Sequence, residues 1–221
     1  MVDKTKVDKI DVICQLRPMK DAPPPIGCHY EQAMQDAMDV FMRYGYRKTS
    51  MNDVAGAIGI SRQALYKRHK TKDALFRATV KFWIERSEVA GYEALNDKNL
   101  SLENRLHMAM DIWCGQHVDD LRASPHSHEI IALANVQAKD MCHKLWARIN
   151  RRIGEALQEN LGEADAQWRD DAVLTIGVAA EGLLHTAENH AEFDQGMRAV
   201  LRLILGTYSG GTAAPAALGT K

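Results

Sequence analysis

Two short helices joined by a single glycine are encoded in the first third of the chain. Ser50-Met-Asn-Asp53 has the spacing of a capping box, with a carboxylate in the first turn, and predicts a helix over about 51–58. Gly59 ends this helix, and Ser61 is a good N-cap for a second helix over about 62–68. A tight glycine turn between two such helices is a specific structural unit.

The apolar residues of this segment fall on the side where the two helices would meet. Ala55 is small at the point where they pack closely, and four larger residues would form the shared inner face: Val54, Ile58, Ile60 and Leu65. Caps, turn and inner face together predict a helix-turn-helix, a unit that places its second helix in the major groove of DNA.

The rest of the chain also has helical periodicity. A helix over about 28–44 has one apolar face and is ended by Gly45, and Thr71 is positioned to cap a long helix over about 72–95. Five further helices are predicted over about 101–120, 124–139, 140–160, 166–190 and 193–208. With nine helices and no convincing strand, the predicted fold class is all-α.

Positive charge is concentrated around the helix-turn-helix. The chain as a whole has 28 Lys and Arg against 29 Asp and Glu. Residues 45–72 nevertheless contain seven cationic side chains and only one acidic side chain, Asp53. The net charge of this segment is therefore about +6, and that of the remainder is about −7. Such asymmetry favours a polyanion-binding face. The alternative is that these charges form an ordinary solvated surface.

The chemistry of the second helix suits base recognition. Arg62 can donate to guanine O6 and N7, Gln63 can pair with adenine, and Ala64 can approach a thymine methyl. Lys72, at the start of the next helix, suits a phosphate contact, whereas Tyr66 could either touch DNA or pack. The predicted DNA-binding residues are Thr49, Ser50, Ser61, Arg62, Gln63, Ala64, Tyr66, Lys67, Lys70 and Lys72.

Residues 30–76 resemble the TetR family of transcriptional regulators. The resemblance lies in "RYGY" and in "TSMNDVAGAIGISRQALYKRHKTKDALF", which match a specific pattern of a capped helix, a glycine turn and a Leu-Tyr pair. The family usually has Phe where this chain has His69, which leaves open whether His69 packs under the helix or has a polar role.

The resemblance implies an all-helical homodimer, formed mainly by the last two helices, that a small molecule releases from DNA. Apolar residues on those helices are the predicted dimerisation set, although the same faces could pack within the chain: Ile176, Ala180, Leu183, Leu184, Val200, Leu201, Ile204 and Leu205.

The chain divides into four predicted parts. Pro23-Pro24-Pro25 closes a flexible extension over 1–27, for which a basic DNA-contacting arm is the alternative. The helix-turn-helix domain covers 28–75, a ligand-binding and dimerisation domain covers 76–208, and a disordered tail covers 209–221.

The effector site is the least specified part of the sequence. An apolar pocket with polar anchors could be lined by Met110, Trp113, His117, Met141, Trp146 and His185, although Met and Trp on helices are more often ordinary core. Cys114 with His117, and Cys142 with His143, could together ligate a metal, but no established metal spacing is present. No metal or cofactor is therefore predicted.

Other classes of protein are disfavoured. There is no secretory signal and no apolar run of membrane-spanning length, so a cytoplasmic protein is predicted. No nucleophile elbow, P-loop, dinucleotide fingerprint or HExxH occurs, which argues against an enzyme with an incidental basic helix pair. The leading hypothesis is a repressor released from a palindrome-like, double-stranded DNA operator by a small-molecule effector. A DNA-binding activator or architectural protein without an effector is the alternative.

Overall fold

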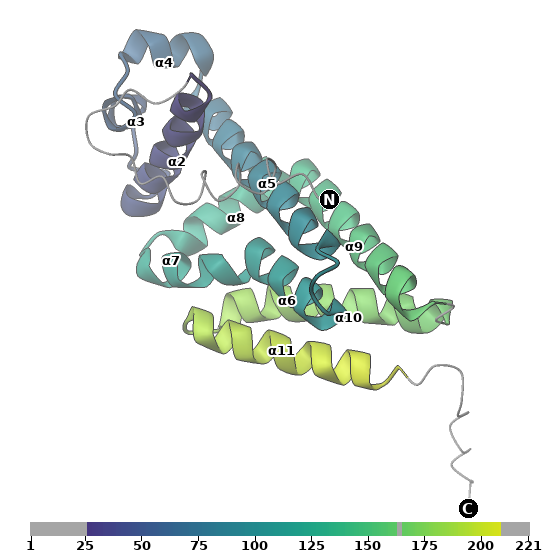
Figure 1. The fold of residues 1–221 in the computed structure, drawn as a ribbon. Coiled ribbons are helices and arrows are strands. Elements are labelled where there is room, and N and C mark those ends of the chain that lie inside the picture. The colour runs from purple at the N-terminus through teal and green to yellow at the C-terminus, as the bar shows by residue number, and fades with distance from the viewer. Residues whose placement is uncertain (1–25, 163–164, 209–221) are drawn as a thin grey trace, which may run out of the picture.

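The computed structural model describes residues 26–162 and 165–208, and every regular element within these ranges is a helix (Figure 1). The elements are α2 (Ile26–Tyr44), α3 (Met51–Ala57), α4 (Arg62–Arg68), α5 (Lys72–Asn96), α6 (Leu102–Trp113), the 3-10 helix η1 (Gly115–His117), α7 (Val118–Ala123), α8 (Ser127–Gln137), α9 (Lys139–Leu161), α10 (Ala166–Thr186) and α11 (His190–Gly206). The all-α fold class is confirmed, with a helix-turn-helix followed by a larger helical part. The predicted tail at 209–221 lies outside the described residues, as does most of the extension at 1–27, although residues 26 and 27 already belong to α2.

Local capping signals set the helix starts around the helix-turn-helix. Ser50 and Asp53 form the reciprocal capping box of α3, with Ser50 Oγ accepting from the Asp53 N–H at 3.3 Å. Ser61 caps α4 by accepting from the Ala64 N–H, and Thr71 caps α5 by accepting from the Ala74 N–H. Gly59 has φ +70°, a left-handed conformation that favours glycine, and so turns the chain between α3 and α4.

The helix predicted over 101–120 is divided into α6, η1 and α7. Cys114 leaves helical geometry with φ −132° and ψ −56°. Gly115 packs so closely on the Phe193 ring that a Cβ there would lie 2.6 Å from it. The prediction that Cys114 and His117 share one helix is therefore wrong, because packing against α11 interrupts the helix between them.

The last two helices also differ from their predicted bounds. The structure ends α10 at Thr186 rather than near residue 190. Asn189 then caps α11 by accepting from the Glu192 N–H at 3.0 Å, so α11 begins three residues before its predicted start. A capping asparagine was missed, and its local signal was present in the sequence.

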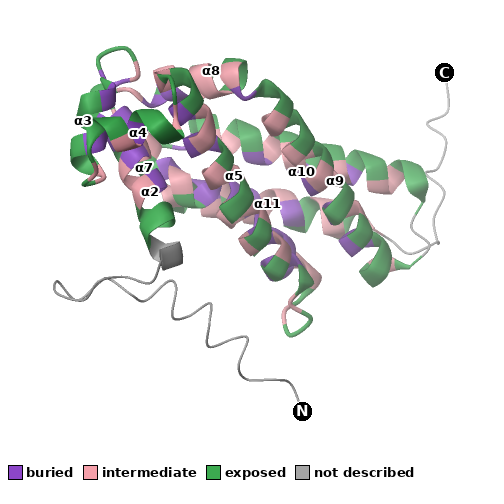
Figure 2. Ribbon diagram, turned by 90° about the horizontal axis from the view of Figure 1, so that it is seen from above, coloured by how far each residue is buried: buried purple, intermediate pink, exposed green. Residues whose placement is uncertain are grey.

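The helix α5 connects two cores. Its first turns contribute Leu75, Phe76 and Val80 to a core shared with α2, α3, α4 and α8, while Ala94 and Leu95 lie at its other end. Leu95 belongs to the second core, which α6, α9, α10 and α11 complete. Figure 2 shows the buried residues on the inner faces of these helices and exposed residues covering their outer faces. The predicted domain boundary at 75/76 thus falls inside one continuous helix.

Gly91→Ala is expected to lower the free energy of unfolding by about 1–3 kcal/mol because a Cβ would overpack a fixed indole. A Cβ at Gly91 would lie 2.2 Å from the Trp113 ring, which is held by a hydrogen bond from Nε1 to the Ser87 carbonyl at 2.9 Å. Urea unfolding measures the change.

Gly154→Ala is the matched control, since its nearest neighbour would be the Val173 methyl at an ordinary 3.6 Å. That helix-interior substitution should be neutral or stabilising by about 0.5–1 kcal/mol. Equal stability of the two variants would contradict the close packing at Gly91.

Candidate nucleic-acid interface and ligand cavity

The helix α4 lies at one end of the molecule and is anchored by a single side chain (Figure 1). Leu65 is 1% exposed and is the only buried residue of α4. The remaining long side chains of the helix all point to solvent: Arg62, Gln63, Tyr66, Lys67 and Arg68. This arrangement presents three cations and one amide on a convex, accessible helix, as insertion into a DNA groove requires.

Arg62 and Tyr66 lie one turn apart and contact each other. The Arg62 guanidinium carbon is 5.3 Å from the Tyr66 ring centroid, and the tyrosine is 37% exposed. Stacking on the ring limits the conformations of the arginine without using its N–H donors. Both side chains therefore remain accessible at the tip of α4.

Two of the predicted DNA contacts are directed into the protein instead. Thr49 is buried, and its hydroxyl donates to the Gly45 carbonyl at 2.7 Å. Lys72 Nζ donates to three carbonyls in the turn before α3: Tyr46 O at 2.8 Å, Arg47 O at 3.4 Å and Thr49 O at 2.9 Å. An ammonium group has three N–H donors, so this geometry does not favour the predicted phosphate contact of Lys72.

The remaining predicted contacts differ in exposure. Ser50, Ser61 and Lys70 are exposed, and Ala64 is half-buried. The two serines accept hydrogen bonds as helix caps, so their hydroxyl groups have a structural use in the free protein. Lys70 forms no hydrogen bond or ion pair within the described residues and leaves its full charge at the surface.

The sequence did not predict a polar network that lies beneath the turn at 45–49. The Tyr46 hydroxyl donates to Asp73, which also accepts from Gln137 Nε2 at 3.0 Å. Burial raises the pKa of Tyr46 to about 12, and Lys72 Nζ lies 4.4 Å from its ring centroid. The network ties the helix-turn-helix to α8, and its partners are too far apart in the sequence to show a local pattern.

His69 ends α4 as its C-cap and is half-buried. Burial, with a smaller effect of the neighbouring Arg68, lowers the pKa of His69 below its usual value. The ring is therefore neutral at pH 7, which is compatible with its taking the place of the phenylalanine usual at this position.

A cavity of about 630 Å³ lies between α2 and the helices that follow the helix-turn-helix. Of the predicted ligand residues, Trp113, His117 and Trp146 line it. The structure places the other three elsewhere: Met110 is fully buried in the second core, Met141 packs against the first core, and His185 is exposed near the end of α10. Sequence reasoning missed Trp83 and the methionines of α2, because only folding brings them to this space.

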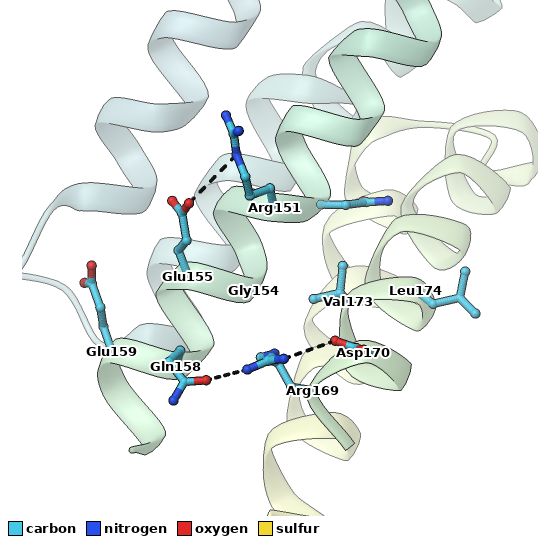
Figure 3. Close-up of a pocket in the computed structure, with 10 residues that line it drawn as sticks. Arg151, Gly154, Glu155, Gln158, Glu159, Arg169, Asp170, Val173 and Leu174 are labelled. Atoms are coloured by element: carbon cyan, nitrogen blue, oxygen red, sulfur yellow. Dashed lines mark hydrogen bonds and ion pairs between the residues drawn. The ribbon is translucent and has the colours of Figure 1, made fainter. Parts of the chain in front are cut away.

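A second, more polar cavity of about 610 Å³ lies between α9 and α10. Figure 3 shows its charged side chains paired with neighbours, Arg151 with Glu155 at 3.8 Å and Arg169 with Asp170 at 3.5 Å. Since these charges are already balanced along the groove, the first cavity is the better candidate for an apolar effector.

The predicted dimerisation residues lie on the inner faces of α10 and α11. Ile176, Ala180 and Leu201 are fully buried within the chain and are not available to a partner. The other five are partly buried against the same core: Leu183, Leu184, Val200, Ile204 and Leu205. The apolar residues that do face solvent on these helices are Leu174, Val178 and Leu203, at 61%, 61% and 72% exposure.

Three other features of the described helices bear on function. Within 26–162 and 165–208, no three His, Cys, Asp or Glu side chains converge as a metal site would require. Cys114 is buried, and burial raises the pKa of its thiol to about 12, which disfavours the reactive thiolate. None of the helices in these ranges has the length and apolar character needed to cross a membrane.

The N-terminal helices are similar to those of known regulators. Residues 34–79 match the family model described as "Bacterial regulatory proteins, tetR family". An uncharacterised HTH-type transcriptional regulator of Bacillus subtilis, YezE, is 42% identical over 59 residues. That match covers 27% of this chain and 30% of the relative, so the chain spans less than a third of the length of this relative.

Solved structures are similar over most of the chain. A transcriptional regulator from Rhodococcus has a TM-score of 0.64 at 15% identity and covers 80% of this chain and 95% of its own. A TetR transcription regulator from Haloarcula marismortui has a TM-score of 0.64 at 14% identity, and the match covers 82% of this chain and 98% of that structure. A TetR transcriptional regulator from Legionella pneumophila has a TM-score of 0.56 at 19% identity, and the match covers 84% of this chain and 98% of that structure. At these identities the likeness concerns the fold.

Proposed function

We propose that this chain, which belongs to the tetR family of bacterial regulatory proteins, is a repressor that binds operator DNA and is released from it by a small molecule. The observation that carries the proposal is the presentation of α4. A helix held by Leu65 alone turns Arg62, Gln63 and Lys67 outward at the end of the molecule. These side chains are those that read guanine and adenine edges and neutralise phosphate.

A homodimer is proposed to place two copies of α4 on one face of the DNA. Leu174 and Val178 lie one turn apart on α10, and Leu203 is exposed on α11. Pairing these helices with a second copy would remove that surface from water in a four-helix arrangement. Two recognition helices about 34 Å apart would then match half-sites separated by one DNA turn.

The cavity supports release by a ligand because its wall includes the DNA-binding part of the chain. Met38 and Met42 on α2 line it together with Trp113 and Trp146 from the following helices. Ser124 also donates to the Met42 carbonyl at 2.6 Å, which links α2 to the segment after α7. A ligand that binds one arrangement of α2 better than another would shift the population away from the DNA-binding form.

Arg62→Ala is expected to cost about 1–3 kcal/mol at the cognate site and to relax the preference at one base position. Fluorescence anisotropy with the DNA immediately upstream of the gene, and with single-base variants of it, measures both effects. Arg86→Ala removes the same charge from an exposed position on α5 and should leave the base preference unchanged. If the Arg62→Ala variant kept its full base preference, Arg62 would not be a residue that reads a base.

The regulatory part of the proposal is tested separately. A thermal-shift screen of small metabolites should yield ligands that stabilise the protein, since binding to the native state raises its stability. Hits are then retested for release of the upstream DNA. Ligands that stabilise the protein yet leave its DNA affinity unchanged would contradict the release mechanism.

A further inference from the structure

We infer that the cavity beside α2 takes a lipophilic cation, a ligand with an aromatic or branched hydrocarbon body and a single ammonium group. The inference rests on the ligand-responsive function proposed above and specifies the chemical class of the effector. It is carried by the three tryptophans that line the cavity and by two carboxylates on its wall that form no ion pair within the described residues.

Three indoles line the interior, and the buried Nε1 of one of them, Trp83, has no hydrogen-bond partner within the described residues. Trp83, Trp113 and Trp146 come from three different helices and line the same space of about 630 Å³, a volume suited to a drug-sized molecule. The polar edge of Trp113 is occupied, because its Nε1 donates to the Ser87 carbonyl at 2.9 Å. Faces of tryptophan are the best aromatic partners for a cation, and they also accept hydrocarbon.

The charges on the wall are predominantly negative. Asp39 on α2 and Asp120 on α7 both line the cavity, and neither forms an ion pair within the described residues. Partial burial is the main cause that raises the pKa of Asp39; a hydrogen bond from Gln35 Nε2 at 3.1 Å lowers it, and the negative charges of Asp36 and Asp120 raise it further. A ligand cation between α2 and α7 would relieve this repulsion.

The positive groups near the cavity do not cancel the two carboxylates. Arg43 also lines the wall and, like Asp39 and Asp120, is exposed; its guanidinium carbon lies 5.5 Å from the Tyr44 ring centroid. His117 is turned toward the Trp83 ring, and burial lowers its pKa, so the imidazole is neutral at pH 7. The charged side chains on the wall are therefore two carboxylates and one guanidinium, and this excess of negative charge disfavours an anionic ligand.

A cation held in this place would act directly on the DNA-binding helices. Asp39 lies on the same helix as Met38 and Met42, and Asp120 lies on the segment whose Ser124 is bonded to Met42. Drawing the two carboxylates toward one ammonium group changes the position of α2 relative to α7. This is the differential contact that a population shift requires.

The test compares three probes that share a 2-naphthylmethyl body by titration calorimetry on the full-length protein at pH 7.5. They are (2-naphthylmethyl)trimethylammonium, its uncharged carbon isostere 2-neopentylnaphthalene, and 2-naphthylacetate. The ammonium is expected to bind about tenfold more tightly than the isostere, the effect of a partly desolvated cation on indole faces. The acetate is expected to bind most weakly.

Variants that remove one negative charge test whether the carboxylates on the cavity wall cause the preference for the ammonium probe. Asp39→Asn and Asp120→Asn should each weaken ammonium binding by about fivefold and leave the neutral isostere unchanged. Glu93→Gln is the matched control, because it removes the same charge from an exposed residue of α5 that does not line this cavity. It should bind the ammonium nearly as the wild type does.

The outcomes separate the ligand class from the regulatory function. Equal or tighter binding of the isostere or the acetate, or no binding of the ammonium, would overturn the cationic class while leaving release by another ligand intact. Tight ammonium binding that leaves the affinity for upstream DNA unchanged would support the class and contradict the proposed release.

Discussion

Val178→Glu is expected to convert the protein to monomers and to lower its affinity for operator DNA by about 100-fold or more. Val178 is 61% exposed at the middle of α10, beside the equally exposed Leu174. In a two-fold dimer through this face, each copy would bring a carboxylate into an apolar contact without a partner for its charge. A monomer binds one half-site only and loses the gain from linked binding, which is about 10²–10⁴.

Analytical ultracentrifugation and fluorescence anisotropy measure the two effects on the same samples. Val136→Glu is the control, since Val136 is 76% exposed on α8, away from α10 and α11. It should remain dimeric and bind DNA normally. A Val178→Glu protein that stays dimeric would place the interface on another surface.

Lys72→Met is expected to lower the free energy of unfolding by about 2–3 kcal/mol and to weaken binding to all DNA sequences by about tenfold. The ammonium group of Lys72 joins the carbonyls of Tyr46, Arg47 and Thr49, and methionine can replace its length but none of its donors. Hydrogen bonds to charged groups are stronger than neutral ones, and unpaired carbonyls carry a desolvation cost. The turn that sets the start of α3 would then lose its support.

The salt dependence of DNA binding separates this structural role from a phosphate contact. Lys70→Met removes the same charge from an exposed lysine two residues earlier, and it should flatten the salt slope by about one without destabilising the protein. Lys72→Met should do the reverse, with lower stability and an unchanged slope. If Lys72→Met flattened the salt dependence of DNA binding and left the stability unchanged, the ammonium group of Lys72 would instead contact a DNA phosphate.

The helix-turn-helix was predictable because its signals are local. Ser50, Ser61 and Thr71 cap the helices that follow them, and Gly59 adopts the left-handed turn expected of it. Each of these interactions spans three or four residues, so the sequence alone contains both partners. Leu65 as an inner anchor followed from the same helical periodicity.

The break at Cys114 and the roles of Thr49 and Lys72 were not predictable in this way. The helix ends at Trp113 because of packing between Gly115 and Phe193, which are 78 positions apart. Lys72 reaches carbonyls more than twenty residues earlier in the chain. A positive charge near a recognition helix suggested phosphate, and only the folded geometry shows that its donors are used internally.

The sequence by itself determined the helical class, the capped helices near the N-terminus and the residues exposed on α4, because caps, turns and periodicity act over short distances. Only the tertiary structure decided which side of α10 stays exposed, since Ile176 and Val178 are both apolar and differ in what folds against them. The same holds for the cavity, whose three indoles belong to α5, α6 and α9 and meet only when those helices pack together.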